Sequence, residues 1–206
     1  ATNNLSNKIA MTLFNPYGSF FRLNLTQEVE TELEALPEEK RAQVKLMAET
    51  TFAKTEKNAM KQLERMSYRT AAVMACKQLI ITGNALIFHP EKGAAQAYNL
   101  RNYCVARDCE GVPVEIIMRD RKAFETFSPE VQEQIMTSMG GPMFIRGQHQ
   151  DITLYTYVSL EADGKYHVRQ CTEHVMLAGT ATYPRALLPW VPLTWNLVRG
   201  EDYGRG

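Results

Sequence analysis

The sequence predicts an α+β fold, with helices in the first 83 residues and antiparallel β-hairpins after them. Three observations lead to this prediction. Apolar residues recur at helical spacing before Gly83, and one long polar segment, residues 38–66, keeps a helical pattern without a break. Two hairpin turn signals follow, at residues 108–111 and 161–164, each between runs rich in β-branched and aromatic residues.

Four helices are predicted in order before the strands begin. The first covers residues 5–14 and ends at an Asn-Pro-Tyr-Gly turn. The second has Thr26 as its N-cap, with glutamates in its first turns, where acidic side chains favour the helix dipole. A proline separates it from the helix over residues 38–66, which would be roughly 40 Å long. Ser67 is predicted to cap a fourth helix rich in alanine, which ends before Gly83 and should pack closely against a neighbour.

The strands are predicted from short apolar or alternating runs between turn signals. A short helix interrupts them and begins at Pro129, because proline is favoured at the first helical position. The last segment carries two prolines, which restricts it to an edge of a sheet. The predicted extended segments are residues 85–88, 102–107, 112–119, 152–160, 165–171 and 189–192.

The composition excludes several classes of protein. The chain has 206 residues, of which 45% are hydrophobic and 22% charged, as expected of an ordinary soluble globular chain. No apolar run approaches the roughly 20 residues needed to cross a bilayer, so no membrane partner is expected. The 23 basic and 23 acidic residues balance, which argues against a dedicated DNA-reading module.

The motifs of common enzymes and metal sites are missing from the sequence. It contains no phosphate-binding glycine loop, no Gly-x-Ser-x-Gly turn and no His-Glu-x-x-His helix. Its four cysteines form no Cys-x-x-Cys pair, and the closest approach to a zinc motif is His167, Cys171 and His174. We therefore expect no catalytic residue, no cofactor and no metal, and we expect the cysteines to be free, half-buried thiols.

Charged residues are segregated along the helical half. Residues 28–39 are rich in glutamate, and a basic stripe follows at 3-4-4 spacing, which places its members on one helical face. The stripe could be a solvated face, could contact phosphate, or could pair with the acidic residues within or between subunits. The candidate subunit-interface residues are Glu28, Glu32, Lys54, Lys57, Lys61 and Arg65.

Five phrases, collinear along the chain, resemble a known family. Residues 3–16 read NNLSNKIAMTLFNP, which is similar to the NNLASKLMLALFP opening of portal proteins from short-tailed bacteriophages, also called head-to-tail connectors. Residues 63–86 resemble the family's helix-to-strand junction, which ends in LKQLVVTGNVLLYLP. Residues 98–108 and 117–120 resemble its YRLssYVVxRD and VTRD phrases, and residues 189–206 its P…W….GExYGRS/G segment.

The resemblance marks sixteen residues as family-motif positions with a structural role. Glycines among them would leave the backbone free to turn, at Gly83 after a helix and at Gly200 and Gly204 near the end. The marked residues are Asn4, Leu5, Lys8, Phe14, Arg69, Gly83, Asn84, Arg107, Asp108, Arg119, Asp120, Gly200, Glu201, Tyr203, Gly204 and Arg205.

The resemblance implies that the chain is a fragment of a portal subunit. Residues 1–83 would be the helical part of the portal wing, residues 84–199 its hairpin-rich part, and residues 200–206 the start of the segment leading to the stem. In the family a further segment precedes the first phrase and a long region follows the last one. Stem, clip and crown are therefore expected to be largely absent.

The resemblance also implies a function and partners. Portal subunits form a dodecameric ring at one capsid vertex of the virion, assembled in the host cytoplasm. Double-stranded DNA passes through the ring during packaging and ejection. The expected protein partners are further copies of the chain, terminase, major capsid or scaffold proteins, and tail adaptor proteins. A conduit should not hold DNA tightly, and zero net charge suits that requirement.

Two other functions remain open at the level of sequence. A small cytosolic enzyme would require Cys171 and His174 to converge with a carboxylate in a pocket of the hairpin half. A monomeric nucleic-acid-binding module would use the stripe from Lys54 to Arg65.

Overall fold

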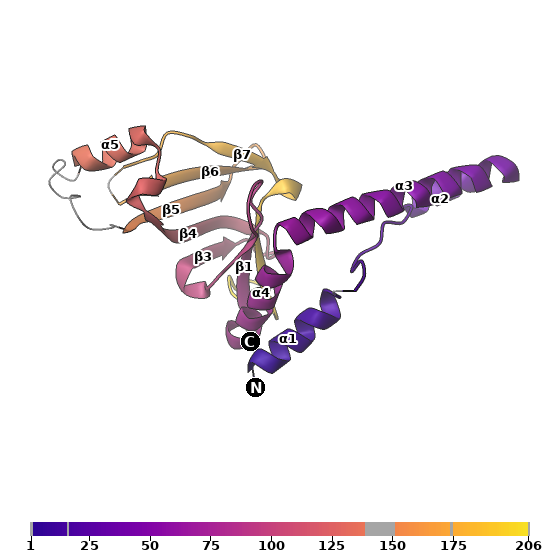
Figure 1. Ribbon diagram of the computed structural model, residues 1–206, viewed down its shortest axis with the longest axis horizontal. Coiled ribbons are helices and arrows are strands. Elements are labelled where there is room, and N and C mark those ends of the chain that lie inside the picture. Colours follow the sequence, from indigo (N-terminus) through magenta and orange to yellow (C-terminus); the bar gives the residue numbers. More distant parts are fainter. Residues whose placement is uncertain (1, 16, 139–150, 174, 206) are drawn as a thin grey trace. The chain divides into compact units, whose positions relative to one another are not determined.

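The computed structural model describes residues 2–15, 17–138, 151–173 and 175–205 (Figure 1). Helices come first and antiparallel strands follow, which confirms the predicted α+β class. The chain divides into two compact units. The first consists of Ala1–Lys77 and His89–Gln96, and the second of Gln78–Phe88 and Ala97–Gly206.

The first unit is built from helices close to the predicted ranges. They are α1 Thr2–Leu13, α2 Gln27–Glu34, α3 Glu38–Arg65 and the first part of α4 Tyr68–Thr82. Helix α1 begins three residues before the prediction. Thr26 is the N-cap of α2 with extended backbone, as predicted, but its side chain makes no capping hydrogen bond.

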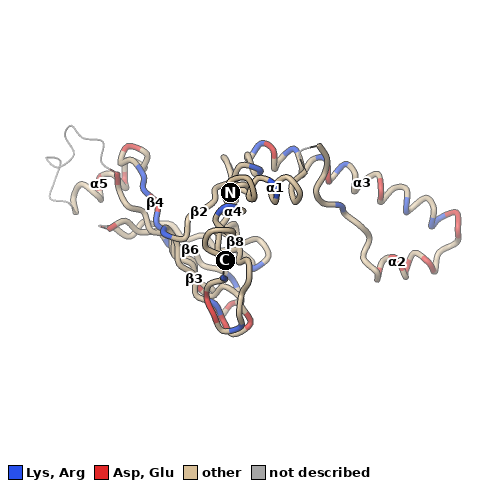
Figure 2. The backbone as a smooth tube through the Cα atoms, turned by 90° about the horizontal axis from the view of Figure 1, so that it is seen from below, with Lys and Arg blue, Asp and Glu red and all other residues tan. Residues whose placement is uncertain are grey.

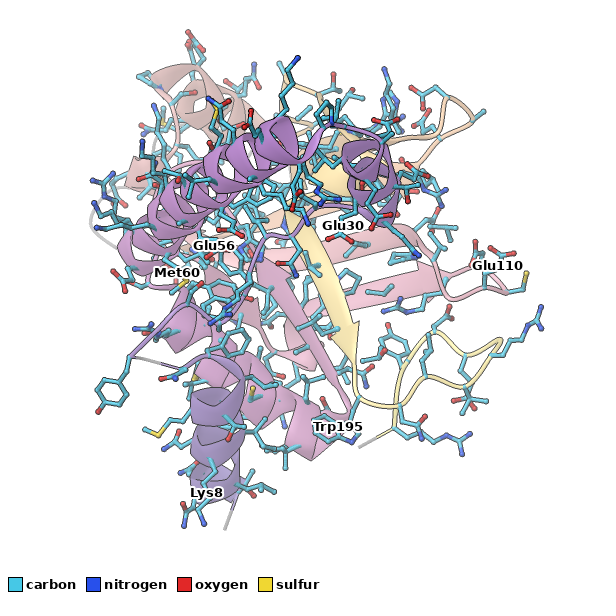
Figure 3. All side chains as sticks on the ribbon, turned by 90° about the vertical axis from the view of Figure 1, so that its right-hand side faces the viewer. Lys8, Glu30, Glu56, Met60, Glu110 and Trp195 are labelled. Carbon is cyan, nitrogen blue, oxygen red and sulfur yellow. The ribbon has the colours of Figure 1, made fainter. Side chains whose placement is uncertain are left out.

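Helix α3 is long and exposed. It has 28 residues, about 42 Å at 1.5 Å per residue, and none of them is buried. The extended segment after α1 lies along its middle, where the Leu23 N–H donates to Glu56 Oε1 at 2.6 Å. An open cavity of about 570 Å³ lies there, lined by Glu30, Phe52 and Glu56 among others; Figure 3 labels both glutamates. No helix in the described ranges is both long and apolar enough to cross a membrane.

Ser67 lies directly before α4, as predicted, but its side chain makes no capping hydrogen bond to the described residues. Ser67 has a φ of +51°, and its N–H donates to the Glu64 carbonyl at 3.0 Å. This is the left-handed residue that follows a helix C-cap, so Ser67 ends α3. Its carbonyl also accepts from the N–H groups of Thr70 at 3.0 Å and Ala71 at 3.5 Å, at the start of α4. The alanine-rich face of α4 is buried as expected: Ala71, Ala72 and Ala75 are each at most 3% exposed.

The first sheet of the second unit has three strands in the order β2-β1-β8. They are β1 Asn84–Phe88, β2 Gln96–Tyr98 and β8 Trp190–Thr194. The strand with proline lies at an edge, as predicted, and Pro192 is opposite Leu86. Strand β2 was not predicted because three residues are too few for an alternating pattern.

The second sheet has five antiparallel strands in chain order, visible side by side in Figure 1. Both predicted hairpins are confirmed. Strand β4 is longer than predicted and pairs as far as Ala123, opposite Asp151, and β7 was not predicted. The strands are β3 Tyr103–Arg107, β4 Pro113–Ala123, β5 Asp151–Leu160, β6 Lys165–Thr172 and β7 Ala181–Pro184.

One face of the five-stranded sheet forms the core of the second unit. Ile116, Met118 and Val158 are completely buried and belong to one cluster with Leu86 and Trp190 of the smaller sheet. A second cluster forms under α5 Pro129–Ser138 around the completely buried Ile135. The two sheets and α5 therefore cover the apolar interior of this unit.

Leu86 tests this core directly. Leu86→Ala removes a completely buried side chain, so the free energy of unfolding should fall by about 2–5 kcal/mol in urea titrations. Leu187, which is 69% exposed, is the matched control, and its replacement by Ala should change stability by less than about 0.5 kcal/mol. Equal effects of the two substitutions would contradict the assigned core.

Candidate functional site

Several family-motif residues meet in the second unit, where residues 198–205 cross the start of β1 and the end of β3. The polar contacts of this site join parts of the chain that are about 100 residues apart. The motif residues in it are Gly83, Asn84, Arg107, Asp108, Tyr203 and Gly204.

Asn84 and Gly204 form the centre of this site. The Asn84 side chain donates from Nδ2 to the Gly204 carbonyl at 2.8 Å, and its Oδ1 accepts from the Gly204 N–H at 2.7 Å. Nδ2 also donates to the Thr82 carbonyl at 2.7 Å. Asn84 is 4% exposed, so these groups have little access to water. One amide side chain thus satisfies the backbone of a residue 120 positions away.

Gly204 is required by close packing. A Cβ at this position would lie 2.9 Å from the Gly83 carbonyl oxygen, 2.9 Å from Thr194 Cβ and 3.1 Å from the Asn196 carbonyl oxygen. The Gly83 carbonyl is already occupied, because it accepts from the Trp195 N–H at 2.8 Å. The end of the described chain therefore lies directly against β1 and the end of β8.

The C-terminal segment also covers the free edge of β3. The Val105 N–H donates to the Tyr203 hydroxyl at 3.1 Å, and the Arg107 N–H donates to Asp202 Oδ1 at 2.7 Å. Two side chains thus replace the neighbouring strand that β3 lacks on this side. Asp202 was not among the predicted site residues, because the family phrase leaves its position open.

The Arg107 side chain ties three segments together. Its guanidinium donates to the carbonyls of Gly111 at 2.7 Å, Asp202 at 3.0 Å and Pro192 at 3.4 Å. Burial lowers the pKa of the Arg107 guanidinium below the ordinary arginine value. Burial also shifts the neighbouring Tyr103, in this case raising the pKa of its hydroxyl. The guanidinium donors are engaged by backbone carbonyls, which is a structural use of the arginine.

Asp108 builds the hairpin turn that the sequence predicted. Its Oδ1 accepts from the N–H groups of Glu110 at 2.9 Å and Val112 at 2.8 Å. Gly111 has a φ of +85°, and a Cβ there would lie 2.9 Å from Leu197 Cδ2. This turn therefore packs directly against Leu197, with no room for a side chain at position 111.

Other marked residues lie outside this site. Asp120 lies on β4, and its carboxylate accepts a hydrogen bond from the Tyr98 hydroxyl at 2.9 Å. Glu201 and Arg205 form an ion pair at the surface, and Gly200 has a φ of +83° with open space around it.

In the first unit, Phe14 and Arg69 hold the end of α1. The Phe14 ring lies edge-on to Tyr68 with centroids 5.5 Å apart, and Tyr68 stacks on His89 at 5.3 Å. Arg69 donates to the Asn15 carbonyl at 3.2 Å. Burial lowers the pKa of His89 and raises that of Tyr68, as expected for rings packed together.

Some predicted residues are brought into no site. Asn4, Leu5 and Lys8 are exposed on α1, and their side chains make no hydrogen bond or ion pair in the described part of the chain. The six candidate interface residues on α2 and α3 are all exposed. Across residues 2–15, 17–138, 151–173 and 175–205, no ion pair joins the acidic to the basic ones.

The described residues do not form a metal site or a Cys/His site. No group of three His, Cys, Asp or Glu side chains with metal-binding geometry occurs among the described residues. Cys171 is partly buried on β6, while His174 lies outside the described residues. Cys104 and Cys109 are exposed, although half-buried thiols were expected.

Comparison with known proteins decides the family. The model of the family described as bacteriophage head to tail connecting protein matches residues 1–206, the whole chain. The chain belongs to this family. The collinear phrases of the sequence therefore indicated the right relatives.

Individual relatives of the chain support this family membership. It is 35% identical over 205 residues to a portal protein of Enterobacteria phage SP6, covering all of this chain and 38% of that protein. It is 31% identical to a portal protein of Enterobacteria phage T3 and 29% identical to one of Escherichia phage T7, with 98% of this chain covered in both cases. The chain spans less than two-fifths of the length of these curated relatives.

Gly204 tests the packing of the site. Gly204→Ala places a methyl group against backbone and Thr194, so the free energy of unfolding should fall by about 1–3 kcal/mol. Gly18, with nothing within 4 Å of an added Cβ, is the control and should tolerate Ala within about 0.5 kcal/mol. A Gly204→Ala chain as stable as the parent would mean that the C-terminal segment is not held against β1.

Asn84 tests the hydrogen bonds of the same site. Asn84→Ala leaves the Gly204 N–H and two carbonyls without their partner, which should cost about 1–3 kcal/mol in denaturant unfolding. Asn99→Ala is the comparison, because Asn99 caps a short exposed turn through Arg101 N–H alone. A loss of unfolding free energy no greater for Asn84→Ala than for Asn99→Ala would show that the buried amide does not hold Gly204.

Proposed function

We propose that this chain is the helical and hairpin part of a portal subunit, one copy of a dodecameric ring at a capsid vertex of the virion. The ring would be a conduit for double-stranded DNA during packaging and ejection and would dock terminase, capsid or scaffold proteins, and tail adaptor proteins. Membership of the connector family and the portal names of the relatives support this proposal. Assembly would take place in the host cytoplasm.

The role proposed is structural and not catalytic. The marked residues at the centre of the site, Asn84, Arg107 and Gly204, engage their polar groups within the chain itself. A catalytic group must instead present its polar atoms to a substrate. This arrangement supports a scaffold whose motif maintains the fold of the subunit.

The exposed α2–α3 arm is the observation that best supports assembly. Helix α3 has 28 residues without one buried side chain, which is more surface than a helix of a monomer ordinarily leaves unused. Figure 2 shows acidic residues on α2 and at the turn into α3, and basic residues interspersed with acidic ones along the rest of α3. We infer that these two charged regions meet between neighbouring subunits.

Ring geometry explains why two different surfaces are needed. A closed ring uses a heterologous interface, in which one surface of each subunit meets a different surface of the next. Glu28 and Glu32 would belong to one surface, and Lys54, Lys57 and Lys61 to the other. Exposed pairs contribute only about 0.2–1 kcal/mol each and are screened by salt, so several must act together.

Charge reversal tests the interface. In the full-length subunit, Lys57→Glu with Lys61→Glu should shift rings toward monomers at low salt, measured by sedimentation and negative-stain imaging. Adding Glu28→Lys and Glu32→Lys should restore rings in part, because opposite charges face each other again. The control reverses Lys92 and Lys165, exposed lysines outside α3, and should leave assembly unchanged.

Two outcomes would count against these proposals in different ways. Parent subunits that never form rings at any salt concentration would overturn the portal function itself. Rings that form equally well with the Lys57 and Lys61 reversals would overturn only the interface and leave the stripe as a solvated face.

A further inference from the structure

The outward face of the five-stranded sheet differs in chemistry from its buried face. Side chains alternate along β4, so that Met118 is completely buried while Arg119 and Arg121 are exposed. The β4–β5 register places Tyr155 opposite Arg119 and Thr153 opposite Arg121. Directly opposed residues share a face, so arginine and tyrosine side chains lie next to each other on the outward side.

Charges at one end of this face are already paired. Tyr157 donates its hydroxyl to Glu115 at 2.7 Å, Arg169 pairs with Glu161 at 2.6 Å, and His167 lies 3.0 Å from Asp163. These side chains already have polar or charged partners within the chain. This end of the face therefore has little charge left for a partner.

The other end carries unpaired positive charge. Neither Arg119 nor Arg121 has an ion pair or side-chain hydrogen bond to any of the described residues. Both line an open cavity of about 320 Å³ together with Asn102 and Asp120. Asp120 already accepts a hydrogen bond from the Tyr98 hydroxyl at 2.9 Å. The charged groups that line the cavity are therefore two arginines and one carboxylate that already has a hydrogen-bond partner.

We propose that this arginine surface, consisting of Arg119, Arg121, Asn102 and Tyr155, contacts the phosphate backbone of double-stranded DNA. Guanidinium groups present several N–H donors in a planar fork that matches phosphate oxygens. Two arginines at alternate positions of a strand have Cα atoms roughly 7 Å apart, so both reach the same stretch of an extended polyanion. The site is open, which suits a backbone that lies across it.

The contact with DNA would be weak, and a conduit needs weak contacts because tightly bound DNA could not slide through it. Each subunit would neutralise about two phosphates, and such contacts weaken steeply as salt rises. Phosphates carry no sequence information, so DNA of any sequence would pass. This inference rests on the proposed function, because it takes the polyanion to be the DNA that the ring handles.

The competing explanation is protection of a sheet edge. Strand β3 pairs with β4 only as far as Met118, so residues 119–123 of β4 lie beyond β3. Charged side chains on such an edge prevent pairing with other chains. That role requires charge of either sign, whereas DNA contact requires positive charge, and this difference separates the two explanations.

The test measures binding of a fluorescein-labelled duplex of about 30 base pairs to assembled rings by anisotropy between about 50 and 200 mM salt. Arg119→Gln with Arg121→Gln should weaken binding at least about fivefold at the lowest salt concentration. It should also flatten the salt dependence, because the log–log slope falls by about 0.9 for every phosphate that the protein no longer neutralises. Arg119→Lys with Arg121→Lys should keep most of the slope. Asp120→Asn should tighten binding, because it removes the carboxylate charge while the amide oxygen still accepts from Tyr98.

The control replaces Arg185 and Arg199, two other exposed arginines of the second unit, with Gln. It removes the same charge and should change binding less than about twofold. Equally weakened binding in both double variants, unchanged binding in both, or no binding by parent rings at the lowest salt concentration would overturn the proposal. Ring images from the same samples keep this result separate from the portal function. If the glutamine variant does not assemble, unchanged binding by the Asp120→Asn rings overturns it.

Discussion

The fold of the second unit depends on the two hydrogen bonds between the Asn84 side chain and the Gly204 backbone. They hold the C-terminal segment against β1, at a position where even a methyl group on Gly204 would collide with neighbouring atoms. Once that segment is held, Tyr203 and Asp202 reach the free edge of β3. Because Asn84 is almost fully buried, breaking the pair would leave polar groups without water to replace it.

Sequence reasoning succeeded where the structural signal is local. The turn at Asp108 and Gly111 follows from an aspartate that binds nearby N–H groups and a glycine with positive φ, and Pro192 restricts β8 to an edge. It failed where a neighbouring element sets the conformation. Ser67 resembles an N-cap but occupies the left-handed position that ends α3, and β7 exists because β6 is beside it.

The candidate site shows the same limit. The resemblance marked Asn84, Arg107 and Gly204 as structural positions, but no local pattern tells which atoms they contact. Asp202 was missed because its role depends on the N–H of Arg107, 95 residues earlier. The basic stripe of α3 and the exposed arginines of β4 are a separate matter, because no ion pair engages them among the described residues. The marked residues Asn84, Arg107 and Gly204 thus maintain the fold of the second unit. Exposed charges, the marked Arg119 among them, are left for the assembly and DNA contacts that we propose.

Amide hydrogen exchange at Gly204 measures whether the C-terminal segment holds the two sheets together. Its N–H donates to a buried side chain, so exchange should require opening of the whole second unit. Gly204 should exchange with about the same opening free energy as Met118 in the core of β4. Exchange of Gly204 at the rate of an unprotected amide, while Met118 stays protected, would show that the C-terminal segment only lies against the sheets and does not hold them.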